Sequence, residues 1–264
     1  MNKKKTNIAE RIYMFLVYLF LYAPIIVLIV YSFNESKTRG KWTGFSLKWY
    51  AKLLEDRAIL QALSNTLTIA IITTIIATIV GTFAAVGFTE YSKNKKKLLL
   101  AINEIPVLNP DIVIAVGLMV LFTALNIEFG MLTLILSHVA FTIPYVILSI
   151  LPKLKMMDRN LSEAAMDLGA TPLQTLFMVI IPEIKQGIIA GAMMAFTLSI
   201  DDFVISFFTK GKGLNTISTT VYAMARKGIN PTINALSTIM FVVTLLLLVI
   251  VYIKTDNKEK NNEK

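Results

Sequence analysis

The apolar residues of this chain are gathered into long, nearly uninterrupted runs, and this pattern limits the folds that are open to it. Each run is about 20 residues long, which is the length that an α-helix needs to cross the roughly 30 Å hydrocarbon core of a bilayer. A soluble domain would instead spread its apolar residues along amphipathic helices and strands. The pattern therefore predicts an all-α integral membrane protein with a single transmembrane domain over residues 1–264.

Six of these runs are predicted to be transmembrane spans. They cover residues 12–33, 66–88, 98–125, 129–151, 187–209 and 233–253. Outer loops are expected at residues 34–61 and 210–231, and a cytoplasmic loop at residues 152–186 separates the fourth and fifth spans. We expect the third span to be interrupted within the segment PVLNPDIV, because proline removes a helix hydrogen bond.

The distribution of lysines predicts the orientation of the chain. An even number of spans places both termini on the same side of the membrane. The lysine clusters Lys3–Lys5 and Lys95–Lys97 would both lie on that side. Because basic residues are enriched in cytoplasmic loops, we expect both termini in the cytoplasm.

Composition excludes several kinds of site and partner. The chain has a formal net charge of +9, no cysteine and one histidine. Disulfides, thiolate metal sites and clusters of imidazole ligands are therefore not expected. Lysines that flank membrane spans explain the basic excess, so no nucleic-acid partner is expected. The chain has no G-x-x-x-x-G-K-[ST] motif and no recognisable nucleophile–base set, which predicts a non-enzyme without its own metal or cofactor that takes its energy from a partner.

Three carboxylates fall inside predicted spans and are candidates for function. A charged side chain at the bilayer centre costs at least about 2.5 kcal/mol, so Asp111, Asp201 and Asp202 are expected to have a role. Asp111 is about 13 residues into its span and Asp201 about 14, so at about 1.5 Å per residue both are expected roughly 20 Å from the cytoplasmic end. Carboxylates at one height would form a cation-selective constriction.

The helical period divides the polar residues of the fifth span between two faces. Thr197 and Asp201 share one face, and Ser199 and Asp202 share the next. One carboxylate can line a pathway while the other faces a neighbouring helix or subunit, and the sequence leaves open which does which. Two structural alternatives remain: Asp111 caps a half-helix after Pro110, and one of the Asp pair bonds to polar groups nearby.

The first outer loop contains a short amphipathic segment, SLKWYAKLLED, that is predicted to be a helix capped by Ser46. Its Trp49 is suited either to meet a substrate or to anchor the loop at the membrane surface. His138 in the fourth span is expected to make a polar packing contact.

The loop between the fourth and fifth spans contains the segment DRNLSEAAMDLGATPLQTLFMVIIP, which predicts two short amphipathic helices joined by a sharp turn. Asn160 is the expected cap of the first helix, with Glu163 as its capping-box partner. Gly169 is expected to end that helix in a left-handed conformation. Thr171 and Gln174 are expected to form the capping box of the second helix. Such a hairpin is suited to dock in a groove of a partner protein.

Within this hairpin, EAAMDLGA followed by VIIP resembles the EAA motif of permease subunits of ABC importers. The matching residues are Glu163, Ala164, Ala165, Gly169 and Pro182, while Val179 and Ile181 stand where the motif prefers isoleucine and leucine. The resemblance implies the type I ABC importer permease fold, with this hairpin as the coupling helix that docks in a cleft of a cytoplasmic ATPase. We expect Pro182 to close the segment.

Further segments, among them NPDIVIAVGLMVLF, LSHVAFTIPYV and FTLSIDDFVIS, resemble the spermidine/putrescine (PotC-type) permeases, a family of binding-protein-dependent inner membrane components. The resemblance implies a bacterial inner-membrane heterodimer with a second homologous permease subunit. It also implies two ATPase subunits that hold ATP and Mg²⁺, and an extracytoplasmic polyamine-binding protein. By resemblance and depth, the residues expected in the substrate path are Asp111, Ser199, Asp201, Asp202 and Trp49.

Two alternatives for the function remain. The first is a permease of the same superfamily that carries another substrate, such as a ferric ion or an organic phosphonate. An anion would call for basic residues at the constriction, and none occurs there. The second alternative is a cation channel or proton-coupled carrier that needs no ATPase.

Overall fold

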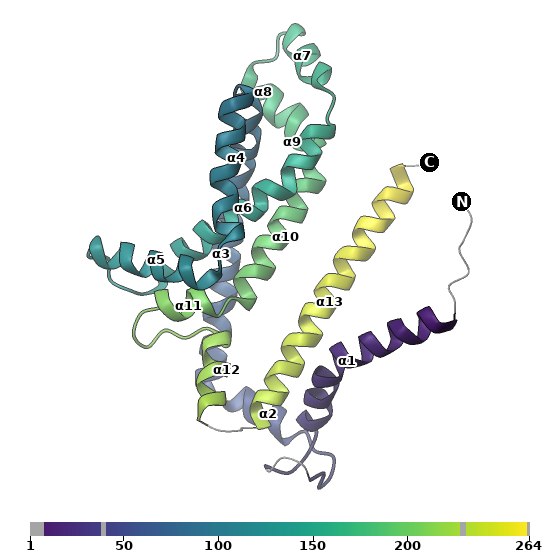
Figure 1. Cartoon of the computed structure of the whole chain (residues 1–264), viewed down its shortest axis with the longest axis vertical. Helices are drawn as coiled ribbons and strands as arrows, with labels where there is room; N and C mark the ends of the chain where they lie inside the picture. The colour runs from purple at the N-terminus through teal and green to yellow at the C-terminus, as the bar shows by residue number, and fades with distance from the viewer. Residues whose placement is uncertain (1–7, 38–40, 228–230, 263–264) are drawn as a thin grey trace. The chain divides into compact units, whose positions relative to one another are not determined.

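The computed structural model describes residues 8–37, 41–227 and 231–262, and within these ranges the chain is helical (Figure 1). An isolated bridge between Asn34 and Phe45 interrupts this pattern. The helices of the first half are α1 (Ile8–Ser32), α2 (Lys48–Glu55), α3 (Arg57–Glu90), α4 (Lys93–Leu108), α5 (Asp111–Ala124) and α6 (Met131–Met156). Those of the second half are α7 (Arg159–Asp167), α8 (Pro172–Thr175), the π-helix η1 (Leu176–Ile180), α9 (Ile181–Glu183), α10 (Lys185–Asp201), α11 (Val204–Thr209), α12 (Ile217–Arg226) and α13 (Pro231–Asn262). The lysine cluster Lys3–Lys5 lies outside the described residues.

The described residues contain three helices that are long and apolar enough to cross a membrane, namely α1, α3 and α6. They coincide with the first, second and fourth predicted spans. Two bent helix pairs raise the number of candidate spans to five if each pair is counted as one. The sixth predicted span falls in α13, whose described apolar part is Pro231–Leu246. An all-helical membrane protein is therefore confirmed.

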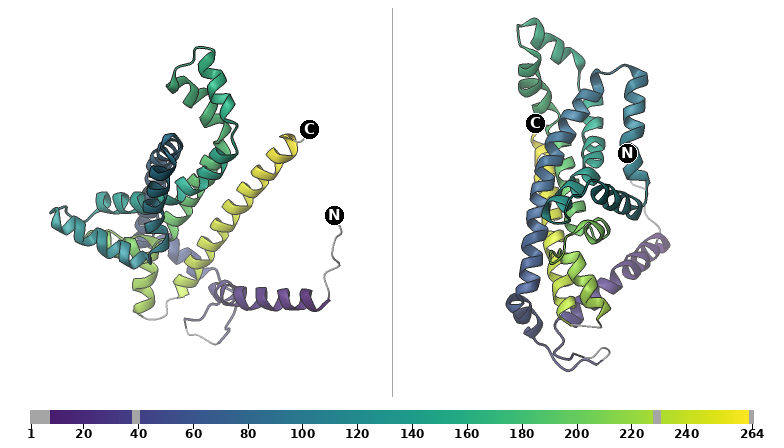
Figure 2. Two further views of the ribbon diagram at one scale, coloured as in Figure 1. Left: turned by 45° about the horizontal axis from the view of Figure 1, so that its top comes forward. Right: turned by 90° about the vertical axis from the view of Figure 1, so that its left-hand side faces the viewer.

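The third predicted span is broken more sharply than a kink. α4 ends at Leu108 and α5 begins at Asp111, with a bend of 102° between the two helices (Figure 2). Pro110 explains the break, because proline pushes the preceding residue out of the helical region, and Asn109 is extended with ψ 146°. The interruption was therefore predicted correctly, and whether the two helices together make one crossing stays a prediction.

The fifth predicted span also differs from the structure. α10 ends at Asp201, two residues follow, and the short helix α11 begins at Val204. A continuous helix over residues 187–209 is therefore wrong. The expected helical pairing of Ser199 with Asp202 does not apply, because Asp202 lies beyond the helix with an extended backbone (φ −63°, ψ 126°).

The chain divides into two compact units. One unit consists of residues 1–60 and 221–264, and the other of residues 61–220. In the first unit α1 and α2 each pack against α13. The short helix α2 buries Trp49 and Leu53.

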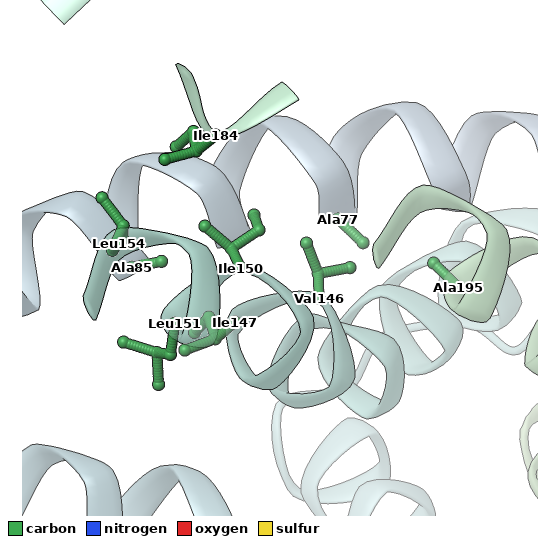
Figure 3. Close-up of a cluster of buried hydrophobic side chains, with 9 residues drawn as sticks. All are labelled: Ala77, Ala85, Val146, Ile147, Ile150, Leu151, Leu154, Ile184 and Ala195. Carbon is green, nitrogen blue, oxygen red and sulfur yellow. The ribbon is translucent and has the colours of Figure 1, made fainter. Parts of the chain in front are cut away.

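The core of the 61–220 unit is centred on α6, in which 61% of the most apolar window is buried. A cluster of small and branched side chains joins α6 to α3 and to α10 (Figure 3). Its members are Ala77, Ala85, Val146, Ile147, Ile150, Leu151, Leu154, Ile184 and Ala195. The cluster fixes the direction of α10 and therefore the position of the chain break at its end.

Close approach of α10 to α6 depends on glycine. Gly187, Gly191 and Ala195 are buried on α10 at four-residue intervals. A Cβ atom at Gly191 would lie 3.1 Å from Val146 Cα, and one at Gly187 would lie 3.1 Å from Ile150 Cα. Small residues at this spacing let membrane helices pack backbone against backbone.

Candidate functional site

The first helix of the EAA hairpin (residues 158–182) is capped two residues earlier than predicted. The cap of α7 is Asp158, whose Oδ1 accepts a hydrogen bond from the Asn160 backbone N–H at 3.0 Å. The predicted cap Asn160 and its pairing with Glu163 are therefore wrong. The reason is that α6 ends at Met156, so the chain is already extended at Asp158, and aspartate caps a helix as well as asparagine does.

The turn and the second helix start form as predicted. Gly169 is left-handed with φ +91°. The backbone N–H groups of Gly169 and Ala170 donate to Met166 O and Ala165 O, which satisfies the last carbonyls of α7. Thr171 and Gln174 form the capping box of α8, with Gln174 N donating to Thr171 Oγ1 and Thr171 N donating to Gln174 Oε1.

Pro182 does not end the second arm of the hairpin. The chain widens into the π-helix η1 and continues through α9 to Glu183, and the bend of 74° comes after that residue. Pro182 offers no N–H to the carbonyl of Met178 and would clash with it in a regular α-helix. A π-turn relieves this clash, and the Ile181 N–H accordingly donates to Leu176 O, five residues back. The predicted closure at Pro182 is wrong.

The hairpin presents apolar side chains to its surroundings. The most exposed are Leu168 at 90%, Met178 at 74% and Leu173 at 67%. Glu163, Ala164, Gly169 and Pro182 of the EAA motif are exposed, and Ala165 is half-buried. On its inner side, residues of the hairpin, α3, α4 and the end of α6 line a cavity of about 1170 Å³.

The adjacent carboxylates Asp201 and Asp202 have different environments. The side chain of Asp202 is 5% exposed, and its two oxygens accept hydrogen bonds from the first turn of α11: Oδ1 from Ile205 N at 3.1 Å and Oδ2 from Ser206 N at 2.7 Å. Asp201 is exposed at the end of α10. Within the described ranges no hydrogen bond or ion pair holds its carboxylate. Asp202 therefore caps α11, and Asp201 is available to a ligand.

His138 joins the two sides of the break at residues 201–203. It is 1% exposed on α6. Its Nδ1 lies 2.8 Å from Ser199 Oγ on α10, and its Nε2 lies 3.0 Å from Ser206 Oγ on α11 and 3.4 Å from Asp202 Oδ2. The expected polar packing contact is therefore present, but its central position among Ser199 and Asp202 was missed. A single histidine among many apolar residues was the available signal.

Asp111 is the first residue of α5 and is exposed. Among the described residues its side chain makes no capping hydrogen bond to α5, so the alternative of a simple helix cap is not observed. One turn further along α5, Ala115 packs with Phe141 of α6 and Ile205 of α11. This cluster holds the start of α5 and the break after Asp201 in the same region of the 61–220 unit.

Trp49 lies in the other unit and is 2% exposed. Its indole Nε1 donates to Asn34 O at 2.7 Å, and the ammonium groups of Lys48 and Lys52 lie 5.6 and 5.4 Å from the ring centroid. Buried aromatic rings with a satisfied N–H usually hold a loop in place. This placement favours the anchoring alternative over a direct substrate contact.

Comparison with known proteins gives a consistent result. Residues 77–257 match the family described as binding-protein-dependent transport system inner membrane component. The chain is 36% identical over 250 residues to the spermidine/putrescine transport system permease protein PotC of Escherichia coli strain K12, covering 95% of each chain. It is 42% identical over 228 residues to the putrescine transport system permease protein PotI of the same organism, covering 84% of this chain and 81% of that one.

A similar fold occurs among solved structures. A chain in the crystal structure of a bacterial ABC transporter involved in the import of the acidic polysaccharide alginate matches with a TM-score of 0.71. The match covers 92% of each chain at 19% sequence identity, so it concerns the fold alone.

Proposed function

This chain belongs to the family of binding-protein-dependent transport system inner membrane components, and we propose that it is the permease subunit of an ATP-driven importer of polyamines such as spermidine and putrescine. It is a transport subunit of the membrane and not itself an enzyme. The observation that carries the polyamine assignment is an exposed carboxylate, Asp201, that has no bonding partner among the described residues. A second exposed carboxylate, Asp111, begins α5, which packs against α11, and the relatives of this chain include polyamine permeases.

The lengths of two helices support a common depth for these carboxylates. α4 has 16 residues before the bend that precedes Asp111, and α10 has 17 residues and ends at Asp201. At about 1.5 Å per residue these helices rise about 24 and 26 Å. The two rises agree even though the chain bends after α4. Two carboxylates at similar height attract a flexible polycation and repel anions.

The polar residues of the path have different roles in this proposal. Asp111 and Asp201 face the substrate. Ser199 and Asp202 shape the break in the fifth segment, because their polar atoms are already bonded inside the protein. Trp49 acts on the entry side by holding the outer loop, through its bond to Asn34.

Coupling to ATP hydrolysis is assigned to the hairpin. Its exposed leucines and methionines match what a groove of a partner protein would bury. Ala164 and Gly169 are exposed, Ala165 is half-buried and Glu163 lines the cavity on the inner side, while Pro182 shapes the second arm through the π-turn. The second arm of the hairpin also contacts the membrane helices, since Phe177 packs edge-on against Phe83 of α3.

The complete transporter follows from these assignments. The chain crosses the inner membrane of a bacterium six times as a single domain of the type I importer fold, if α4 with α5 and α10 with α11 each count as one crossing. Both termini are in the cytoplasm. The partners are a homologous permease subunit in a heterodimer, two ATPase subunits that hold ATP and Mg²⁺, and an extracytoplasmic polyamine-binding protein. No cofactor is bound by this chain.

Uptake by the reconstituted complex tests the substrate. Proteoliposomes that contain this chain and its partners should take up labelled putrescine or spermidine only with ATP inside the compartment that faces the hairpin. Asp201→Asn should reduce uptake at limiting substrate by about tenfold, as expected when one charged contact is lost. Glu128→Gln, which neutralises another exposed carboxylate, is the matched control and should leave uptake unchanged.

Several outcomes would contradict the proposal. Transport of ferric ion or phosphonate in place of polyamines would show another substrate of the same superfamily. Cation flux through the isolated chain without an ATPase would show a channel or carrier. A Glu163→Lys variant that still binds and couples to the ATPase would contradict the role of the hairpin.

A further inference from the structure

A buried polar cluster, the His138 cluster, lies where α6, α10 and α11 meet in the 61–220 unit. It consists of His138, Ser199, Asp202 and Ser206, with exposed fractions of 1% for His138, 3% for Ser199 and 0% for Ser206. Both ring nitrogens of His138 are engaged, one with the last turn of α10 and the other with the first turn of α11. One imidazole thus bridges the two sides of the break between α10 and α11.

The hydrogen-bonding capacity of the four groups determines how they are arranged. An ionised Asp202 carboxylate can only accept, so the tautomer with a proton on His138 Nε2 suits its oxygen 3.4 Å away. In a neutral ring Nδ1 then has a lone pair and accepts from the Ser199 hydroxyl at 2.8 Å. In this tautomer Ser199 donates to His138. The cluster satisfies every polar atom that the His138 side chain brings into the interior.

Burying the carboxylate of Asp202 would be unfavourable in free energy without hydrogen-bond partners. A buried carboxylate is tolerated when it is hydrogen-bonded, and here it receives two backbone N–H groups as well as the imidazole. With Asp202 held on the inner side, the backbone turns and Asp201 remains exposed. Asp202 thus has partners on both α6 and α11, whereas Asp201 has none among the described residues.

We propose that His138 is a positioning residue: it locks Asp202 and the break between α10 and α11, so that Asp201 is the carboxylate presented to the substrate path. His138 acts through Ser199, Asp202 and Ser206 and does not itself touch the substrate. This inference rests on the proposed function, because it takes a polyamine as the substrate of the path.

Thiol labelling at position 201 tests the proposal directly. The chain has no cysteine, so Asp201→Cys introduces its first thiol. The rate at which a cationic methanethiosulfonate modifies this thiol is measured on the chain by mass spectrometry, in the assembled transporter. The measurement is repeated with His138→Phe, which keeps a ring but removes both nitrogens.

The matched control is Ser137→Ala. Ser137 is the buried neighbour of His138, and its hydroxyl donates to Thr133 O within the same helix. We expect His138→Phe to slow labelling by about tenfold, the change in population that one lost hydrogen bond can produce. The labelling rate with His138→Gln, which keeps a donor toward Asp202, should lie between the rates with His138 and with His138→Phe. Ser137→Ala should leave the rate unchanged.

An equal labelling rate with and without His138 would overturn the proposal. If the phenylalanine variant does not assemble, Ser199→Ala and Ser206→Ala each remove one partner of the ring, and unchanged rates in both would overturn it as well. Labelling needs no transport, so it separates the two proposals. If the labelling rate depends on His138 but the transporter does not take up polyamines, the positioning role is retained and the polyamine substrate is rejected.

Discussion

Replacing Gly191 by alanine should weaken the packing of α10 on α6. The new Cβ would lie 3.0 Å from Val146 Cγ1, 3.1 Å from Val146 Cα and 3.2 Å from Val146 O. Carbon atoms at their best separation are about 3.5–4.0 Å apart, so the helices must move apart by a few tenths of an ångström. Two of the three contacts are with the main chain of Val146, which cannot rotate away. Overpacking of this kind costs about 1–3 kcal/mol.

The matched control is Gly87→Ala, on α3. No described atom lies within 4 Å of a Cβ at Gly87, so this variant gains only the higher helix propensity of alanine, about 1 kcal/mol. Because that gain applies to both variants, the difference between them isolates the packing cost. Thermal unfolding of the assembled transporter, followed by fluorescence-detected size exclusion, should give a lower midpoint for Gly191→Ala than for Gly87→Ala. Equal midpoints would refute the packing argument.

Three further predictions concern single contacts. Trp49→Phe removes the buried hydrogen bond to Asn34 O and should lower the free energy of unfolding by about 1–3 kcal/mol. Trp42 is 50% exposed, so Trp42→Phe should change the free energy of unfolding little. Equal losses in the two variants would contradict the anchoring role. Gly169→Ala forces a side chain into φ +91° and should destabilise the hairpin by about 1–2 kcal/mol, seen as faster amide exchange at residues 164–170. Thr171→Ala removes the cap of α8 and should cost about 1 kcal/mol, with Thr171→Ser restoring most of it; no recovery with serine would argue against the hydroxyl bond.

Features that depend on a few neighbouring residues were predicted well. The left-handed Gly169 and the capping box of Thr171 with Gln174 are local, because each needs only residues three or four positions away. The break at Pro110 is local for the same reason. The GxxxG spacing of Gly187 and Gly191 is also visible in the sequence and marks where two membrane helices approach closely, but it was missed.

The cap of α7 shows the limit of local reasoning. Asp158 and Asn160 are both good caps, and the choice between them depends on where the preceding helix ends. Trp49 is a second case, since an anchoring and a substrate-binding tryptophan have the same sequence context. Its burial and its bond to Asn34 are made only when the outer loop folds back on itself.

The sequence by itself determined the helical membrane architecture, the hairpin and the presence of acidic residues in the apolar segments, because apolar length and helix capping are short-range properties. Only the tertiary structure decided which of two adjacent acids is exposed. Asp201 and Asp202 are identical in chemistry, and they differ because α6 places His138 opposite one of them and α11 offers that same residue two backbone N–H groups. A side chain more than 60 positions away in the chain makes that distinction, and no local pattern encodes it.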